Sequence, residues 1–169
     1  YLQWWVRGSN TPALVTTSPT GTPVGSAGVL PTASVLFGNE RMNTTGRSGG
    51  RFTAGYWFNE CQPTAIEDTF FFLGNVGQVY ANTSGGSPIL ARPFFNVDTS
   101  RQDAVLVAYP NTITGSIAIS SSSQVWGNEV NLRRALYFDD CKRVDVLAGW
   151  RYFQLNEGLN INTNSTSLD

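Results

Sequence analysis

The clearest pattern in the sequence is an alternation of apolar and polar residues over 126–155. Successive side chains of a strand point to opposite faces, so a period of two predicts β-strands. Two alternating runs flank the short polar stretch 139–143, which is long enough only for a tight reversal. The polar positions of these runs include Glu129, Asn131, Arg133, Asp145 and Arg151. The stretch therefore predicts a β-hairpin with one apolar and one polar face.

A second region has the same organisation. Residues 51–58 and 64–73 both alternate, and the polar stretch 59–63 separates them. The second run is less regular, because Phe70 to Phe72 are apolar on both faces and Asp68 falls on the apolar one. The pattern predicts another hairpin, in which Asp68 either lies near a membrane surface or marks an error in the assignment of faces.

The remaining segments predict a further strand at 1–7, two long connections, and a short strand over 33–38 within the first connection. Residues 1–7 alternate and read as a strand with aromatic side chains. Residues 8–31 carry four prolines, no charge and many Gly, Ser and Thr residues, so we expect a long loop with little regular structure. We assign 9–48 and 75–112 as loop excursions. Loops of this length are uncommon unless they serve a function.

The chain is expected to form one β-barrel domain, 1–169, or the N-terminal part of one. An alternating strand over 114–137 would exceed the usual length, so we expect it to project beyond the main sheet and to pair there with 75–82. The polar tail, 158–169, is expected to fray or to begin another loop. Because the sequence begins within a strand-like run, we expect it to be a mature or truncated segment.

Composition excludes several classes of function. Charged residues make up 14% of the chain, and 11 Lys and Arg residues balance 12 Asp and Glu residues, which gives no electrostatic footprint for nucleic acid. The chain has no His, so it lacks the commonest general base and the commonest transition-metal ligand. No metal-binding or phosphate-binding motif is present. We therefore expect no enzyme activity, no metal and no cofactor.

The two cysteines fall in corresponding turns, Cys61 in the first hairpin and Cys141 in the second. A disulfide between turns at the same end of a sheet is geometrically possible. It would add about 4 kcal/mol in an oxidising compartment by the chain-entropy estimate. Two free thiols are the alternative, since the sequence does not give the separation of the Cα atoms.

Two architectures satisfy strands with one apolar and one polar face. In a soluble β-sandwich the apolar face packs on a core and the polar face meets water. In a transmembrane β-barrel the apolar face meets lipid and the polar face lines a wet interior. No stretch approaches the about 18 apolar residues of a membrane helix, so a spanning chain would have to cross as strands.

Several phrases also resemble one family. They are WWVRGSNTPALVTTSP, RSGGRFTAGYWFNEC, FFFLG, LARPFFNV, AVLVAYP, WGNEVNLRR and VDVLAGWRYFQLNEGLNI. In this order, over nearly the whole chain, they are similar to the putative β-barrel porin-7 family of bacterial outer-membrane proteins. The resemblance implies an all-β fold, an antiparallel up-and-down meander that forms a complete or incomplete transmembrane barrel, with long loops at one end. It implies a fragment or a short member, and it brings no catalytic residues.

On this reading the polar side chains line the lumen and the apolar ones meet lipid. The predicted lumen-facing network comprises Arg51, Glu67, Glu129, Arg133, Asp145 and Arg151. The predicted lipid-facing or girdle residues are Trp4, Phe52, Tyr56, Val130, Leu132, Trp150 and Tyr152. The network either plugs a narrow barrel with mutually paired charges or tunes the passage of ions through a pore. Arg134, on the apolar face, reads as an interfacial anchor.

The expected function is that of a passive outer-membrane β-barrel protein, porin-like or structural. The expected partners are membrane lipid and further copies of the chain, because about five clear strands fall short of the roughly eight that close the smallest barrels. The alternative is a soluble extracellular β-sandwich, a surface-layer or binding module that uses its long loops. The sandwich requires the apolar face to be buried under a second sheet, whereas the barrel requires this face to be exposed to lipid.

Overall fold

The computed structural model describes residues 1–58, 64–139 and 141–168. Its elements are β1 (Leu2–Trp4), β2 (Asn10–Thr17), the 3₁₀ helix η1 (Val24–Ser26), β3 (Ser34–Arg41), β4 (Arg47–Trp57), β5 (Thr64–Ser84), β6 (Leu90–Asn96), β7 (Arg101–Ala108), β8 (Ile113–Asp139) and β9 (Lys142–Ser167). All strand pairs given with a register are antiparallel. The all-β, antiparallel fold class is thus confirmed. In the described part of the chain, the strands form two sheets and close no barrel.

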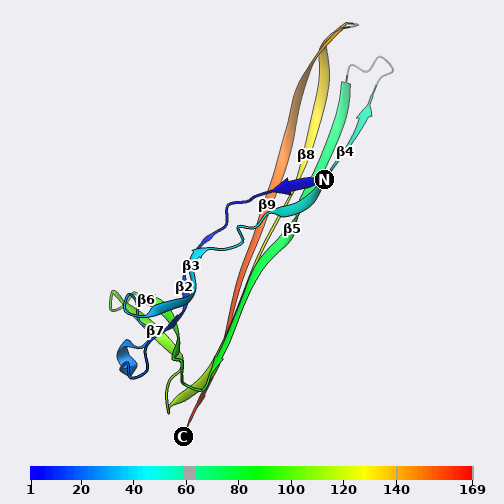
Figure 1. The fold of residues 1–169 in the computed structure, drawn as a ribbon. Helices are drawn as coiled ribbons and strands as arrows, with labels where there is room; N and C mark the ends of the chain where they lie inside the picture. Colours follow the sequence, from blue (N-terminus) through cyan, green and yellow to red (C-terminus); the bar gives the residue numbers. More distant parts are fainter. Residues whose placement is uncertain (59–63, 140, 169) are drawn as a thin grey trace. The chain divides into compact units, whose positions relative to one another are not determined.

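Both predicted hairpins are present. β4 pairs with β5 in regular register from Gly49 with Leu73 to Trp57 with Ala65. β8 and β9 are neighbours in the same sheet, whose strand order is β1-β4-β5-β8-β9. Figure 1 shows these long strands side by side. The alternation of the sequence predicted these elements because each strand there has two chemically distinct faces.

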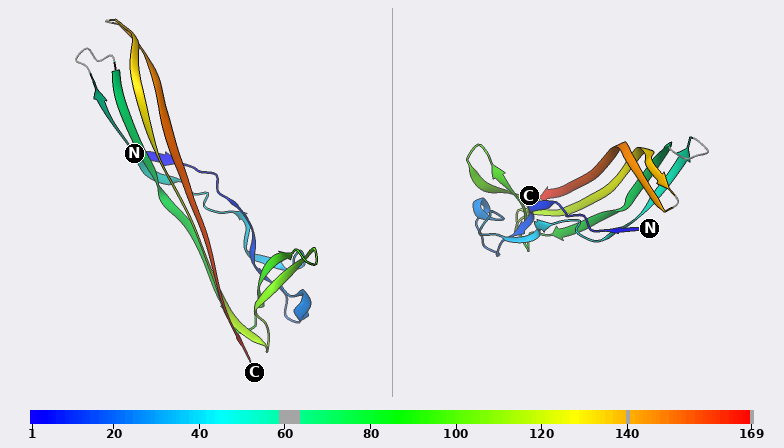
Figure 2. Two further views of the ribbon diagram at one scale, coloured as in Figure 1. Left: turned by 180° about the vertical axis from the view of Figure 1, so that it is seen from behind. Right: turned by 90° about the horizontal axis from the view of Figure 1, so that it is seen from above.

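The chain divides into two compact units. Unit 1 contains residues 1–6, 45–76 and 123–157, and unit 2 contains 7–44, 77–122 and 158–169. β5, β8 and β9 contribute residues to both units. The described residues of unit 1 form a single sheet, in which β1 is an edge strand shorter than the predicted 1–7. The long strands of this sheet can be followed in two further views in Figure 2.

Unit 2 corrects the prediction that 9–48 and 75–112 are loop excursions, although β3 confirms the short strand expected over 33–38. Each excursion supplies a pair of strands, and these four form a second sheet of order β3-β2-β6-β7. β2 lies in the stretch expected to lack regular structure, and it joins the two pairs through Thr16 opposite Ala91. β6 continues through Pro93, which lies opposite Ala104 of β7. Local composition suggested loops here, but pairing between segments distant in sequence makes strands.

Unit 2 has its own hydrophobic core. The core combines side chains of the second sheet with side chains of β8, and β5 and β9 pack against it. Its buried members are Leu14, Val15, Met42, Leu90, Val107, Ala108, Ile117 and Ile119, with Phe37, Tyr80 and Ile161 partly buried around them. Unit 2 is therefore a two-layered β structure that buries its apolar side chains in the ordinary way.

The predicted extension of the long strands is also tested in unit 2. The backbone N–H of Gln78 on β5 donates to the Ser121 hydroxyl on β8 at 3.1 Å, which confirms that 75–82 lies beside this strand. The tail does not fray, because β9 continues to Ser167 and Ser165 donates to the Val107 carbonyl at 3.1 Å. Pairing with its neighbours orders this polar tail.

The faces of β8 and β9 exchange their chemistry between the units. In unit 2 the odd-numbered Ile117 and Ile119 are buried in the core, and the even-numbered positions are mainly small and polar. In unit 1 the odd-numbered positions of β8 carry Glu129 and Arg133, and the even-numbered ones are mainly apolar. β9 changes in the same sense, from Trp150 to Asn160 on its even-numbered side. Each strand is therefore built for a different environment in each unit.

β5 behaves differently. Its buried positions are odd-numbered up to Leu73, whereas Tyr80, an even-numbered residue, packs against the core of unit 2. Its neighbour Val79 is 80% exposed. The alternation is thus offset by one residue after Leu73.

No helix in the described part of the chain is long and apolar enough to cross a membrane.

Candidate functional site

The polar side chains of unit 1 share one face of its sheet. The register places Arg51 opposite Phe71 and Gly55 opposite Glu67, so the odd-numbered residues of β4 and β5 lie on the same side. An ion pair from Glu67 to Arg133 extends this side to the odd-numbered residues of β8. We call this side the polar face. It brings together all six residues that the sequence predicts as a network.

Three carboxylate–guanidinium contacts form the first cluster on the polar face. Arg133 pairs with Glu67 at 2.9 Å and lies 3.7 Å from the Asp145 carboxylate. Asp145 also pairs with Arg143 at 2.9 Å, and the Arg143 guanidinium lies 4.7 Å from the centroid of the Trp57 ring. Arg143 was assigned to a turn from its sequence. In the structure it lies in β9 and forms the shorter of the two ion pairs of Asp145.

The second cluster surrounds Glu129. The Nε–H of Arg151 donates to one carboxylate oxygen at 2.7 Å, and the side-chain amide of Asn131 donates to the other at 2.7 Å. Both oxygens of Glu129 are therefore occupied. The guanidinium of Arg51 has no hydrogen bond or ion pair to any residue that the structure describes, and it interacts with Glu129 only at longer range.

A row of aromatic rings crosses the polar face beside the second cluster. Trp4 of β1 and Phe71 of β5 have ring centroids 5.7 Å apart, and Phe71 and Phe153 of β9 have centroids 6.3 Å apart. Phe71 lies over Gly127 of β8, where an added Cβ would come within 2.5 Å of the ring. The absence of a side chain at Gly127 thus makes room for the ring.

These groups line a depression of about 340 Å³ on the polar face. Its lining residues are Leu2, Trp4, Arg51, Thr69, Phe71, Glu129, Arg151 and Phe153. We call it the aromatic depression. Sequence reasoning did not identify it, although the irregular Phe70–Phe72 run and Phe153 on a polar face were visible signals. Trp4 reaches it through β1, whose position the sequence does not give.

A third polar group lies deeper in unit 1. The Arg47 side chain is only 1% exposed and donates to the carbonyl and the hydroxyl of Ser123 at 3.1 and 2.8 Å. The Ser123 hydroxyl in turn lies 3.4 Å from the Glu157 carboxylate. This network links β4, β8 and β9. No pattern in the sequence indicates this network, because Arg47 lies in a Gly-rich stretch that is typical of an interruption between strands.

The opposite side of the sheet is apolar and exposed. Phe52, Leu132 and Trp150 are 64%, 50% and 64% exposed, Tyr56 and Tyr152 are also exposed, and Val130 is half-buried. Aromatic pairs join its strands, with centroids 6.3 Å apart for Phe70 and Trp126 and 5.2 Å for Trp126 and Tyr152. We call this side the apolar face.

Trp4 and Asp68 lie on opposite faces of the sheet in unit 1. Trp4 does not group with Phe52, because its contact with Phe71 places it on the polar face. Asp68 does lie on the apolar side, where it accepts a hydrogen bond from Asn128 at 2.9 Å and is exposed. Arg134 is exposed on the same side. The face assignment of Asp68 is thus retained and that of Trp4 is corrected.

The predicted disulfide stays a prediction. Cys141 is exposed, and Cys61 lies outside the described residues.

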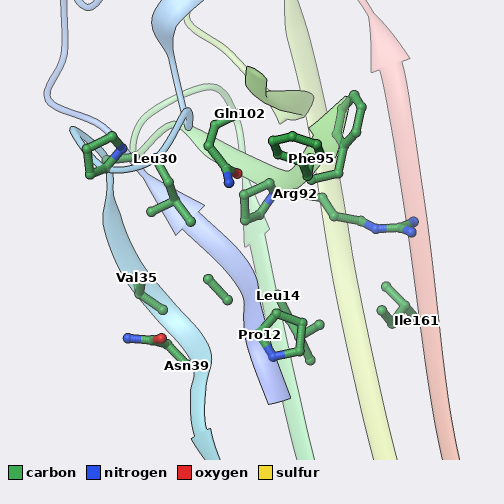
Figure 3. Close-up of a pocket in the computed structure, with 14 residues that line it drawn as sticks. Pro12, Leu14, Leu30, Val35, Asn39, Arg92, Phe95, Gln102 and Ile161 are labelled. Atoms are coloured by element: carbon green, nitrogen blue, oxygen red, sulfur yellow. The ribbon is translucent and has the colours of Figure 1, made fainter. Parts of the chain in front are cut away.

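Unit 2 has a separate cavity of about 820 Å³ (Figure 3). Mainly apolar side chains of the second sheet line it, together with Ile161 of β9. The residues labelled in Figure 3 are Pro12, Leu14, Leu30, Val35, Asn39, Arg92, Phe95, Gln102 and Ile161. Sequence reasoning assigned no site to this region because it treated the surrounding segments as loops.

The fold and the two faces define an antiparallel β protein whose first unit is a single sheet with an exposed apolar side and an ion-paired polar side. The chain belongs to the Putative beta barrel porin-7 (BBP7) family, whose model matches residues 1–169. This confirms the resemblance found in the sequence. No curated protein and no solved structure matches the chain significantly.

Proposed function

We propose that the chain is part of the wall of a bacterial outer-membrane β-barrel, porin-like or structural, which acts passively and without catalysis. In this proposal unit 1 crosses the membrane and unit 2 lies in water. The observation that carries it is the exposed apolar face of unit 1, backed by an ion-paired polar face on the same strands. An apolar outer side and a polar inner side are the signature of a transmembrane barrel wall.

The lengths of the strands support this proposal. A tilted strand needs about 9–11 residues to cross the hydrocarbon core. β4, the shortest of the four long strands, has 11 residues, and the parts of β5, β8 and β9 in unit 1 are longer. The exchange of face chemistry along β8 and β9 fits strands that leave lipid for water. In unit 2 their polar sides are exposed and their apolar sides face a protein core.

The soluble sandwich is less well supported. It requires Phe52, Leu132 and Trp150 to be buried against a second sheet, but all three are at least half exposed. Two-layered packing is present in the protein, in unit 2, where the core side chains are fully buried. Exposure of so many large apolar side chains to water would cost about 1.5–3 kcal/mol each relative to burial. Lipid removes this cost.

Closure of a barrel requires strands beyond those described. The strand order has β1 and β9 at its edges, and an unpaired edge in lipid leaves backbone groups unsatisfied at several kcal/mol each. Self-association is one source of the missing strands. The four arginines and three carboxylates of the first two clusters nearly neutralise one another, so the interior favours weak charge selectivity or a plug.

Neighbouring residues on β8 provide the test. After replacement of both cysteines by Ser, Asn131→Cys and Leu132→Cys place a thiol at the same depth on opposite faces. In lipid vesicles, a charged thiol reagent should label position 131 at least tenfold faster than position 132. The same two variants should be labelled at similar rates when the protein is unfolded in urea. Equal labelling in vesicles would refute insertion of this strand in lipid.

Conductance separates a pore from a plug. The protein reconstituted in planar bilayers should give discrete current steps if the interior is open. Replacement of Arg133 by Gln should then change their size, because it removes a charge from the polar face. Insertion without any current would assign the protein a structural role.

A further inference from the structure

We propose that the aromatic depression of unit 1 is a binding site for small planar organic anions, such as aromatic carboxylates. The proposal concerns a ligand site on the polar face and goes beyond the assignment of a passive barrel wall. It starts from the exposure of the aromatic side chains. Trp4 is 46% exposed and Phe153 is 55% exposed on the side that carries the charged residues.

The position of these rings differs from that expected of lipid-facing aromatic side chains. Lipid-facing aromatic side chains are expected on the apolar face, whereas these rings lie beside Arg51, Glu129 and Arg151. An exposed apolar cluster rimmed by polar groups is typical of a ligand site. The spacing of the rings, 5.7 and 6.3 Å between centroids, is that of aromatic pairs, so a planar solute can extend the row by stacking or edge contact.

The charges of the depression select the sign of the ligand. Both carboxylate oxygens of Glu129 are occupied by Asn131 and Arg151, so this carboxylate offers little to a cation. Arg51 has a guanidinium without a hydrogen bond or ion pair to any described residue. A guanidinium forms its strongest contacts with carboxylates, often through two parallel hydrogen bonds. The depression therefore favours an anion next to a ring.

The size of the depression limits the ligand. A volume of about 340 Å³ lies at the small end of the range of ligand sites, about 300–1,000 Å³. A compound with one aromatic ring and one carboxylate fits this limit. Gly127 contributes to the shape, because any side chain there would displace Phe71.

Binding can be measured on the unmodified chain in detergent micelles by ¹⁹F NMR, with 4-fluorobenzoate as the probe. Line broadening should exceed that of protein-free micelles, and unlabelled benzoate should reverse it. Benzamide, which lacks the charge, and cyclohexanecarboxylate, which lacks the ring, should each compete at least tenfold more weakly. Competition by benzamide equal to that by benzoate would refute the role of charge, and equal competition by cyclohexanecarboxylate would refute the role of the rings.

Two arginines of the same face serve as test and control. Arg51→Gln should weaken binding about tenfold or more, as expected for loss of a hydrogen bond to a charged group. Arg51→Lys should retain part of the affinity. Arg143→Gln removes a charge that is already paired with Asp145 and should change binding less than twofold. Equal losses for Arg51→Gln and Arg143→Gln would refute the site.

A variant without a change in charge tests the rings. Phe153→Leu keeps an apolar side chain and should weaken 4-fluorobenzoate binding about fivefold or more. An unchanged affinity would refute the site. Because the assay uses micelles and no bilayer, failure here leaves the thiol-labelling result unaffected, and failure of that labelling leaves this binding result unaffected.

Discussion

The two units differ in where they place their apolar side chains. Unit 2 buries its apolar side chains between two layers, and Val15 and Leu90 are completely inaccessible. Unit 1 exposes most of its apolar side chains on one face of a single sheet and pairs charges on the other face. The same strands, β8 and β9, take part in both. The same strands therefore carry their apolar side chains on opposite faces in the two units.

The comparison also explains where polar residues carry a cost. In unit 2 the side chains that face water on β8 and β9 are mainly Ser, Thr and Asn, and these have little effect on stability wherever they are exposed. In unit 1 the charged residues are confined to the polar face and occur largely in pairs. Asp68 on the apolar face has a partner in Asn128. A hydrogen-bond partner of this kind would lower the cost of the carboxylate if the apolar face meets lipid.

The largest difference between the units is expected from a matched pair of leucines. Leu90→Ala should lower the free energy of unfolding by about 2–5 kcal/mol, because removal of the buried side chain leaves a cavity in the core of unit 2. Leu132→Ala in vesicles should cost about 1–2 kcal/mol, because lipid chains fill the vacated space. Urea unfolding with hydrogen exchange resolved by unit measures both. Equal costs would indicate that protein packs against Leu132.

A second pair tests the exchange of face chemistry along β9. Trp150→Arg should destabilise the inserted protein by about 2–4 kcal/mol, the cost of an arginine facing the middle of a bilayer. Asn160→Arg lies on the same even-numbered side of β9, in unit 2, and should cost less than about 0.5 kcal/mol. Folding into vesicles, followed by gel mobility and urea titration, gives both values. A large effect at position 160 would contradict an aqueous environment for unit 2.

The smallest effect is expected on the polar face. Arg133→Met breaks contacts to Glu67 and Asp145, and because these side chains are partly exposed the loss should be about 1 kcal/mol. Added salt should reduce the difference between this variant and the unmodified protein by screening. Arg134→Met, one residue along the strand and on the apolar face, should be neutral or stabilising in vesicles. A loss at 134 as large as that at 133 would contradict the assignment of faces.

The sequence predicted unit 1 better than unit 2 for a physical reason. In unit 1 only a few residues separate β4 from β5 and β8 from β9, so local alternation specifies both these strands and their faces. The alternation predicts Glu67, Glu129 and Arg133 on one face, and the structure has them there. In unit 2 the sheet depends on β2 meeting β6, which are separated by more than 70 residues. The local sequence does not predict such a pairing, and Pro12 and Pro93 are unfavourable in strands.

The candidate site was predicted only in part. The alternation of the sequence predicted the charged residues of the polar face. The aromatic depression also requires β1 to lie near Phe71, and the periodicity of a strand does not predict which strand it pairs with. The alternation of residues 1–7 therefore predicted a strand, but Trp4 was assigned to the wrong face of the sheet. Arg47 was missed for a related reason. Its burial depends on Ser123 and Glu157, which lie on two other strands.

The exchange of face chemistry on β8 restricts how its length can change in evolution. Ile119 must face a protein core and Arg133 must remain on the polar face, so an even number of steps has to separate them. Insertion of one residue between them would turn one end inside out, whereas insertion of two would preserve both ends. β5 already contains a one-residue offset after Leu73. An odd number of steps therefore separates Phe71 on the polar face of unit 1 from Tyr80 at the core of unit 2, and a single insertion should be as disruptive near Gly74 as near Val125.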